Sequence, residues 1–122
     1  WTRDDAERLL PRLVELGVEL IEQPFPAKAH LDLAWLQERS SLPIVADESA
    51  VFPDDLEGLV GVVAGINVKL AKCGGIAPAR RMLEAARVMA EHIPIIEDMT
   101  ASPKLTSQST TELFIVNSPL RL

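Results

Sequence analysis

Residues 43–50 read PIVADESA, a short apolar run that ends abruptly in two adjacent carboxylates, Asp47 and Glu48. The same pattern occurs earlier in the chain. Residues 18–24 read VELIEQP, and there the apolar run ends at Glu22. Short, continuously apolar runs that are bounded by proline or glycine are typical of buried strands. Both stretches are therefore predicted to be strands that end at an acidic side chain.

A third run, GINVKLAKCGG at residues 65–75, ends at a lysine, Lys69, in place of a carboxylate. Glu22, Asp47 and Lys69 recur at nearly equal intervals, which indicates one strand–helix unit per interval. The ends of successive parallel strands meet at one edge of a sheet, where barrels and open α/β sheets place their chemistry. We therefore expect these three side chains to lie side by side.

The segments between the runs have helical patterns. Thr2 is predicted to cap a helix that ends at Gly17, because acidic residues follow it and apolar residues recur at helical spacing. Further helices are predicted at 31–38, 53–59 and 76–91. Strands are predicted at 18–21, 43–46, 65–68 and 94–96, with a further strand within 114–122. The alternation predicts an α/β domain over residues 1–102, with a parallel sheet that is covered on both faces, and a divergent segment over 103–122.

Composition excludes several classes of function. The chain has 122 residues and a net charge of −6, which argues against nucleic-acid and anionic-membrane partners. No apolar stretch reaches the ~18 residues that a transmembrane helix needs, and no signal peptide is visible. A single cysteine, Cys73, excludes an internal disulfide and fits the cytoplasm. Because the first residue is Trp1, we expect a piece of a longer or processed protein.

The charged strand ends suggest a specific chemistry. Two carboxylates on adjacent strands are ordinary ligands for Mg²⁺. A lysine beside such a metal, partly removed from water, can lose its proton and act as a base. The metal would acidify the proton alpha to a substrate carboxylate. The competing interpretation is that each acidic residue is only a helix cap or a solvated loop residue. Three charged positions at nearly equal intervals along the chain favour a functional site.

The motifs IEQP, ADES and NVKLAKCGGI, in this order, resemble the muconate-lactonizing subgroup of the enolase superfamily, most closely the dipeptide (Ala-Glu) epimerases. The resemblance covers residues 1–92. It implies a modified (β/α)8 barrel, of which this chain would form about half, strands 4 to 7 or 8. It also implies that Glu22 and Asp47 are Mg²⁺ ligands and that Lys69 is the acid/base lysine. Glu48 would lie behind the ligands and pair with a lysine.

The chain departs from the family pattern at its end. The family has an acidic D-x-D near the last strand, where this chain has IVNSP with Asn117. Glu97 and Asp98 occupy positions where the family has small residues. The third metal ligand and the partner lysine of the family lie on strands that would precede Trp1. We therefore expect the isolated chain to be inactive.

The parent reaction implied by the resemblance is proton abstraction alpha to a carboxylate, with a dipeptide or an N-acylamino acid as the small-molecule substrate. Alternatives on the same scaffold are N-acylamino acid racemase, o-succinylbenzoate synthase and muconate cycloisomerase. A non-catalytic fragment or chimera and a receiver-like module are alternatives of other classes. Because half a barrel leaves open sheet edges, we expect a homo-oligomer, or else a C-terminal segment that folds back to cover one edge.

Overall fold

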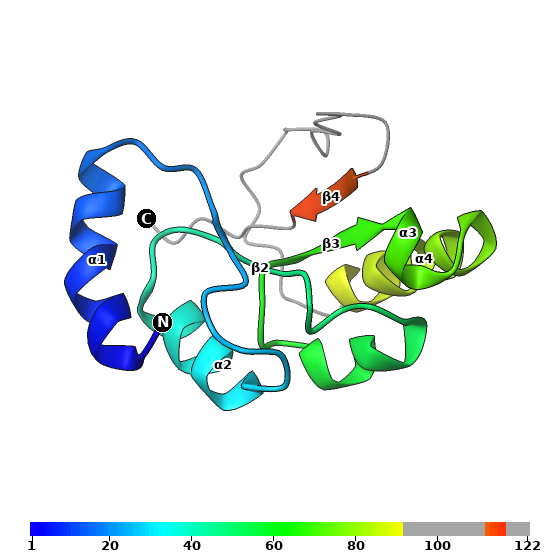
Figure 1. Ribbon diagram of the computed structural model, residues 1–122, viewed down its shortest axis with the longest axis horizontal. Helices are drawn as coiled ribbons and strands as arrows, with labels where there is room; N and C mark the ends of the chain where they lie inside the picture. The colour runs from blue at the N-terminus through cyan, green and yellow to red at the C-terminus, as the bar shows by residue number, and fades with distance from the viewer. Residues whose placement is uncertain (92–111, 117–122) are drawn as a thin grey trace.

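The structure, a computed structural model, describes residues 1–91 and 112–116 (Figure 1). The elements in chain order are α1 (Arg3–Glu15), β1 (Ile21–Glu22), α2 (His30–Arg39), β2 (Ile44–Ala46), the 3-10 helix η1 (Pro53–Leu59), β3 (Gly65–Lys69), α3 (Leu70–Cys73), α4 (Ile76–Glu91) and β4 (Glu112–Val116). Helices α1 and α2 lie at one end of the molecule, and α3 and α4 lie at the other (Figure 1). The predicted alternation of strands and helices is confirmed for residues 1–91.

The strands form a single four-stranded sheet in the order β1-β2-β3-β4. Pairing is parallel between β1 and β2 and between β2 and β3, as the alternation predicts. Strand β4 pairs with β3 in the antiparallel direction over five residues of each strand. The predicted strand at 94–96 lies outside the described residues. The C-terminal strand predicted within 114–122 is described up to Val116 and begins earlier, at Glu112.

The first strand differs from the prediction. It was expected at 18–21, but β1 comprises only Ile21 and Glu22. The cause lies at the end of α1, where the N–H of Val18 donates to the carbonyl of Leu13 at 3.0 Å. Because Val18 still closes the helix, it is not available to the sheet. The shift makes Glu22 a member of the strand, paired with Val45.

The helix starts follow from local chemistry. Thr2 caps α1 as predicted: its Oγ1 accepts from the N–H of Asp5 at 3.1 Å, and Asp5 Oδ2 accepts from the N–H of Thr2 at 3.0 Å. The short helix α3 was not predicted. It ends at Gly74, whose φ of +89° is a left-handed conformation that suits glycine.

The core lies on both faces of β2. Ile44, Val45 and Ala46 are all fully buried. Ile44 and Ala46 belong to the main hydrophobic cluster, together with Leu36 of α2 and Met82 of α4. Val45 points to the opposite face, because successive side chains of a strand alternate, and it is buried there as well. The prediction of a sheet covered on both faces is therefore confirmed for its central strand.

Helices α1 and α2 are joined through one aromatic ring. Trp35 is half-buried, and the guanidinium groups of Arg3 and Arg39 lie 5.0 Å and 4.9 Å from its ring centroid. Arg3 also pairs with Asp32 at 2.6 Å. Cation–π contacts of this kind contribute about 0.5–1 kcal/mol each at exposed sites. The contacts of Arg3 with Trp35 and Asp32 hold α1 against α2, whereas Arg39 and Trp35 both belong to α2.

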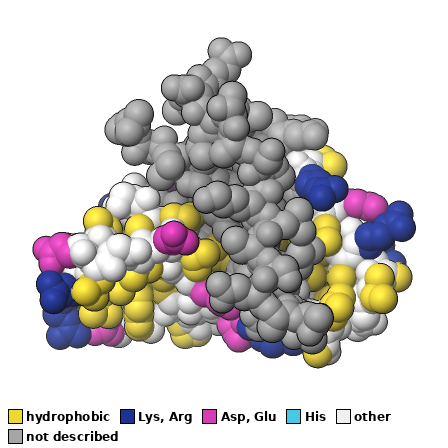
Figure 2. All heavy atoms as spheres, turned by 90° about the horizontal axis from the view of Figure 1, so that it is seen from above, with side chains coloured by type: hydrophobic (Ala, Val, Ile, Leu, Met, Phe, Trp, Pro, Cys, Tyr) yellow, Lys and Arg dark blue, Asp and Glu magenta, His cyan; other side chains and the backbone are white. Residues whose placement is uncertain are grey.

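Several large apolar side chains remain exposed in the described part of the chain, and Figure 2 shows hydrophobic side chains over the end where α1 lies. Leu16, the residue that follows the last residue of α1, is 64% exposed. The other exposed large apolar residues are Trp1, Val14, Leu31, Phe52, Val60, Leu70, Ile76 and Val88. No described helix combines the length and the apolar composition needed to cross a bilayer.

We predict that deleting residues 103–122 promotes self-association. The deletion removes β4 and exposes the backbone N–H and C=O groups along the edge of β3, and such edges pair with other chains. Light scattering across a dilution series should show a shift from the state of the full chain to dimers or larger species. A compact monomer that survives the deletion unchanged would contradict this expectation.

Candidate metal and acid–base site

The carboxyl ends of β1, β2 and β3 lie together, and we call this edge of the sheet the carboxyl edge. Glu22 is the last residue of β1, Asp47 directly follows β2, and Lys69 is the last residue of β3. The parallel register aligns the strand ends, because Glu22 pairs with Val45 and Ala46 pairs with Ile66. The structure thus brings together the three side chains that the spacing placed at one edge.

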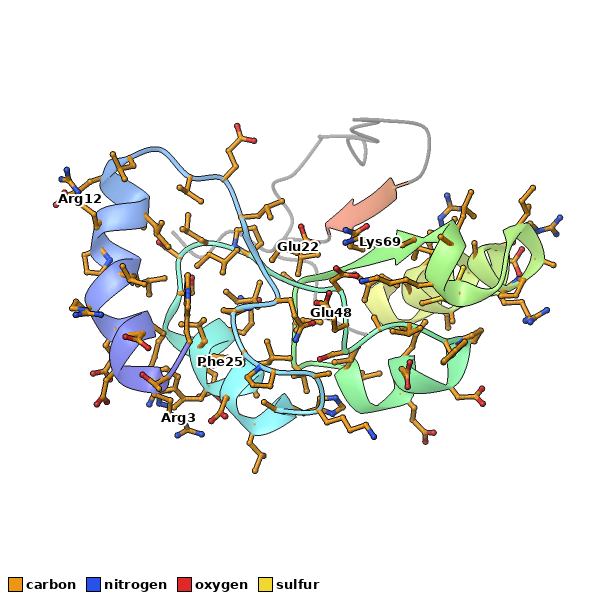
Figure 3. The ribbon with its side chains drawn as sticks, in the orientation of Figure 1. Arg3, Arg12, Glu22, Phe25, Glu48 and Lys69 are labelled. Atoms are coloured by element: carbon orange, nitrogen blue, oxygen red, sulfur yellow. The ribbon has the colours of Figure 1, made fainter. Side chains whose placement is uncertain are left out.

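Lys69 lies between the two carboxylates. Its Nζ is 2.5 Å from Asp47 Oδ2 and 3.5 Å from Glu22 Oε1. The side chain of Asp47 is 5% exposed, that of Lys69 is 22% exposed, and that of Glu22 is 34% exposed. Glu22, Glu48 and Lys69 project toward the middle of the molecule, while Arg3 and Arg12 on α1 lie away from them (Figure 3). One ammonium group therefore bridges carboxylates from two neighbouring strands.

A second lysine, Lys72 of α3, completes the arrangement. Its Nζ lies 3.1 Å from Asp47 Oδ1 and 3.1 Å from Glu48 Oε1. Glu48 thus pairs with a lysine, as the resemblance implied, and Lys72 is that partner. Lys72 was not among the predicted site residues. The available signal was its position three residues after Lys69, since residues three apart at the start of a helix lie on one side of it.

Asn67 is a further polar residue of the site that sequence analysis missed. It is 1% exposed, and its Nδ2 donates to Glu22 Oε1 at 3.0 Å. Asn67 and Lys69 share one face of β3, because alternate residues of a strand point the same way. The Oδ1 atom of Asn67 is buried and has no hydrogen-bond partner among the described residues. Glu22 is therefore held from two directions, by Asn67 and by Lys69.

Burial and the two neighbouring lysines shift the pKa of Asp47 in opposite directions. Burial alone would raise the pKa of this carboxyl, but the hydrogen bonds and charges of Lys69 and Lys72 outweigh it and hold the pKa below its ordinary value. In turn, the hydrogen bond to Asp47, followed by that to Glu48, raises the pKa of Lys72 above its ordinary value. At neutral pH Asp47 is therefore an anion and Lys72 is a cation.

The donor atoms at the carboxyl edge fit a hard divalent cation in part. Glu22 and Asp47 offer carboxylate oxygens from adjacent strands, and Mg²⁺ typically takes one or two carboxylates and keeps several waters. Within residues 1–91 and 112–116, however, no group of three or more His, Cys, Asp or Glu side chains is placed to hold a metal ion. Lys69 contacts one oxygen of each of these two carboxylates, so a cation bound there would compete with its ammonium group.

Comparison with known proteins decides the family. The model of the enolase C-terminal domain-like family matches residues 1–110. The chain belongs to this family. The enolase-superfamily resemblance noted in the three sequence motifs is thereby confirmed.

Relatives within the enolase superfamily include epimerases and cycloisomerases. The chain is 39% identical to an L-Ala-D/L-amino acid epimerase of Maribacter sp., over 73% of its own length and 26% of that protein. It is 40% identical to muconate cycloisomerase 1 of Rhodococcus opacus, over 71% of its own length and 24% of that protein. The chain thus spans about a quarter of the length of the curated relatives that it matches.

Solved structures of the superfamily share the fold. The dipeptide epimerase from Enterococcus faecalis V583, crystallised with Mg and the dipeptide L-Leu-L-Tyr, superposes with a TM-score of 0.69. It is 34% identical in sequence, and the match covers 73% of this chain and 26% of that protein. The α/β fold, in which β1, β2 and β3 pair in parallel, is therefore shared with this superfamily over the matched part of the chain.

The pKa shift of Asp47 predicts how stability responds to acid. A carboxyl whose pKa is lowered by folding stabilises the protein above its unfolded pKa of about 3.9, and this contribution is lost as the pH falls through the lower folded value. We expect Asp47→Asn to reduce the free energy of unfolding at pH 7 by about 1.5–3 kcal/mol, the range for hydrogen bonds to charged groups.

Urea unfolding between pH 7 and pH 2 tests this prediction. The difference between wild type and Asp47→Asn should shrink once the pH falls below about 4. Asp54→Asn, which removes an exposed carboxylate from η1, serves as the charge-matched control and should change the acid response little. A wild-type curve with the same acid dependence as Asp47→Asn would contradict the assignment.

Proposed function

We propose that the chain is part of a Mg²⁺-dependent dipeptide epimerase, within a (β/α)8 barrel of which it forms about half. The observation that supports this most directly is the position of Lys69 Nζ between Glu22 and Asp47 at the carboxyl edge. Family membership and relatives that are named dipeptide epimerases support the reaction type. The single free cysteine, Cys73, which is buried, fits a protein of the cytoplasm.

In this proposal each residue of the carboxyl edge has a distinct role. Glu22 and Asp47 would hold Mg²⁺ through their carboxylate oxygens. When bound, Mg²⁺ makes the proton alpha to a substrate carboxylate more acidic. On one face of the α-carbon, Lys69 Nζ would accept that proton and could return it. Lys72 would remain paired with Glu48 and would continue to compensate the negative charge of that carboxylate.

The balance of charges in the site links metal binding to the protonation of Lys69. Three carboxylates, Glu22, Asp47 and Glu48, face two ammonium groups, Lys69 and Lys72. Lys69 contacts both carboxylates that would hold Mg²⁺, so that a bound metal would compete with the Lys69 ammonium for Asp47 and weaken that ion pair. A lysine released from its ion pair, next to a divalent cation, gives up a proton more easily than an ion-paired one. The same competition that weakens metal binding would thus prepare Lys69 to act as a base.

Muconate cycloisomerisation is a second candidate, because muconate cycloisomerase 1 of Rhodococcus opacus is about as similar in sequence as the epimerase of Maribacter sp.. Both reactions would use the same carboxyl edge. Assays of the complete parent protein with L-Ala-L-Glu and with a muconate would separate them. Turnover of the muconate alone would replace the proposed reaction and leave the roles of Glu22, Asp47 and Lys69 in place.

We predict that the 122-residue chain binds Mg²⁺ in the millimolar range, because few carboxylates bind it and Lys69 competes for them. Lys69→Met should tighten binding roughly tenfold, equivalent to about 1.4 kcal/mol, by removing the competing cation. Asp47→Asn should remove binding. Isothermal titration calorimetry or NMR titration measures all three proteins.

The control for this experiment is Arg8→Met, which removes one positive charge from the exposed surface of α1. It should leave the Mg²⁺ affinity within twofold to threefold of wild type. Binding that persists in Asp47→Asn, or a Lys69→Met variant that binds no more tightly than Arg8→Met, would show that the metal does not use these oxygens.

We predict that the 122-residue chain does not epimerise L-Ala-L-Glu. Removal of a proton from one face and its return to the other require two bases, and Lys69 is the one base that the resemblance assigns within this chain. In the complete parent, Lys69→Ala should abolish epimerisation while the opposite base still exchanges the α-proton with deuterium. Epimerisation by the isolated chain, followed by NMR in D₂O, would refute the requirement for a second base.

A further inference from the structure

The side-chain amide of Gln23 connects the segments that contain Glu22 and Asp47. Its Oε1 accepts from the backbone N–H of Asp47 at 2.9 Å and from that of Ser49 at 3.1 Å. Its Nε2 donates to the carbonyl of Phe25 at 2.8 Å and to Ser49 Oγ at 3.0 Å. A glutamine amide has two N–H donors and two acceptor lone pairs. All four are therefore used inside the protein.

The backbone at Gln23 is unusual as well. Its φ is +38°, in the left-handed region that residues with a side chain rarely adopt. Such conformations persist where the surrounding structure over-determines them, and they concentrate at functional sites. Here the N–H of Gln23 donates to the carbonyl of Val45 at 2.8 Å, in addition to the four side-chain hydrogen bonds. Five hydrogen bonds thus hold one residue directly after Glu22.

We propose that Gln23 is a positioning residue, which fixes Glu22 and Asp47 relative to each other so that both carboxylates reach one Mg²⁺. This inference rests on the proposed function. Strand β1 has only two residues in the sheet, so its ladder alone ties the end of β1 weakly to β2. The Gln23 amide adds a connection at the point where the two ligands leave their strands. Gln23 itself would contact neither metal nor substrate.

The chemistry of the four hydrogen bonds explains why this position needs glutamine. Glutamate would keep the acceptors for Asp47 and Ser49 but would place an oxygen against the carbonyl of Phe25, where a donor is required. Asparagine is one methylene shorter and would not reach the same partners from the same backbone. Methionine has a similar length and no amide, so Gln23→Met removes all four side-chain hydrogen bonds with little change in volume.

Gln37 offers a matched control. It lies on α2, and its Oε1 accepts from the N–H of Ile44 at 3.0 Å, at the opposite end of β2 from Asp47. Gln37→Met therefore removes a glutamine-to-β2 hydrogen bond without touching the carboxyl edge. In the 122-residue chain, both variants should lower the midpoint of thermal unfolding. Only Gln23→Met should weaken Mg²⁺ binding, by about tenfold to a hundredfold, the range for residues that orient metal ligands.

Titration with MgCl₂ by NMR or calorimetry, together with thermal unfolding, separates a positioning role from a structural one. A Gln23→Met variant that loses thermal stability but binds Mg²⁺ as well as Gln37→Met would overturn the proposal. If Gln23→Met does not fold, the comparison passes to Ser49→Ala and to Ser40→Ala, which removes a hydroxyl that hydrogen-bonds to the backbone of Leu42 after α2. Weaker Mg²⁺ binding in Ser49→Ala than in Ser40→Ala supports the proposal, and equal binding overturns it.

A metal-free measurement separates failure of this inference from failure of the proposed function. If the wild-type chain shows no Mg²⁺ binding, the proposed function fails, and Gln23 is judged by amide hydrogen exchange. Faster exchange at the N–H groups of Asp47 and Ser49 in Gln23→Met than in Gln37→Met shows that Gln23 fixes this segment. Equal exchange in the two variants overturns its positioning role.

Discussion

The arrangement of the site depends on the burial of one carboxylate. Asp47 has lost nearly all contact with water, and an isolated charge in such a place is strongly unfavourable. Two lysines from consecutive parts of the chain, the end of β3 and the helix α3, compensate it. Each then contacts a second carboxylate, Glu22 or Glu48. The cluster is thus a network in which each lysine is shared between Asp47 and a second carboxylate.

The parallel sheet makes this network possible. Parallel strands that are joined by helices present the same end of each strand at one edge, so that residues far apart in sequence meet there. The short strands β1 and β2 would give a weak ladder by themselves, and polar side chains add to it where the strands end. Asn67 holds Glu22 from β3, and Gln23 holds the turn after β2. The polar groups that form the site therefore also help to hold the sheet together.

Much of this was predictable from sequence, because the signals were periodic. The positions of Glu22, Asp47 and Lys69 followed from apolar runs that end at regular intervals, and the parallel order of β1 to β3 followed from the alternation with helices. The side chains that hydrogen-bond to the site residues were harder to predict from the sequence. Gln23 lies in the left-handed region, which sequence alone gave no reason to expect, and Asn67 is a polar residue inside an otherwise apolar strand. The start of β1 was misplaced because Val18 bonds back to Leu13 in α1, a local helix-ending hydrogen bond that the apolar pattern does not reveal.

The direction of β4 has a consequence for how the sheet continues. In the register with β3, Glu112 lies opposite Lys69 and Val116 lies opposite Gly65. The chain therefore enters β4 at the carboxyl edge and leaves it at the opposite edge, the reverse of β1, β2 and β3. A repeating strand–helix unit adds each new strand in the same direction as the last. Among the described strands, β4 is therefore the one that does not continue this repeat, although it pairs directly with β3.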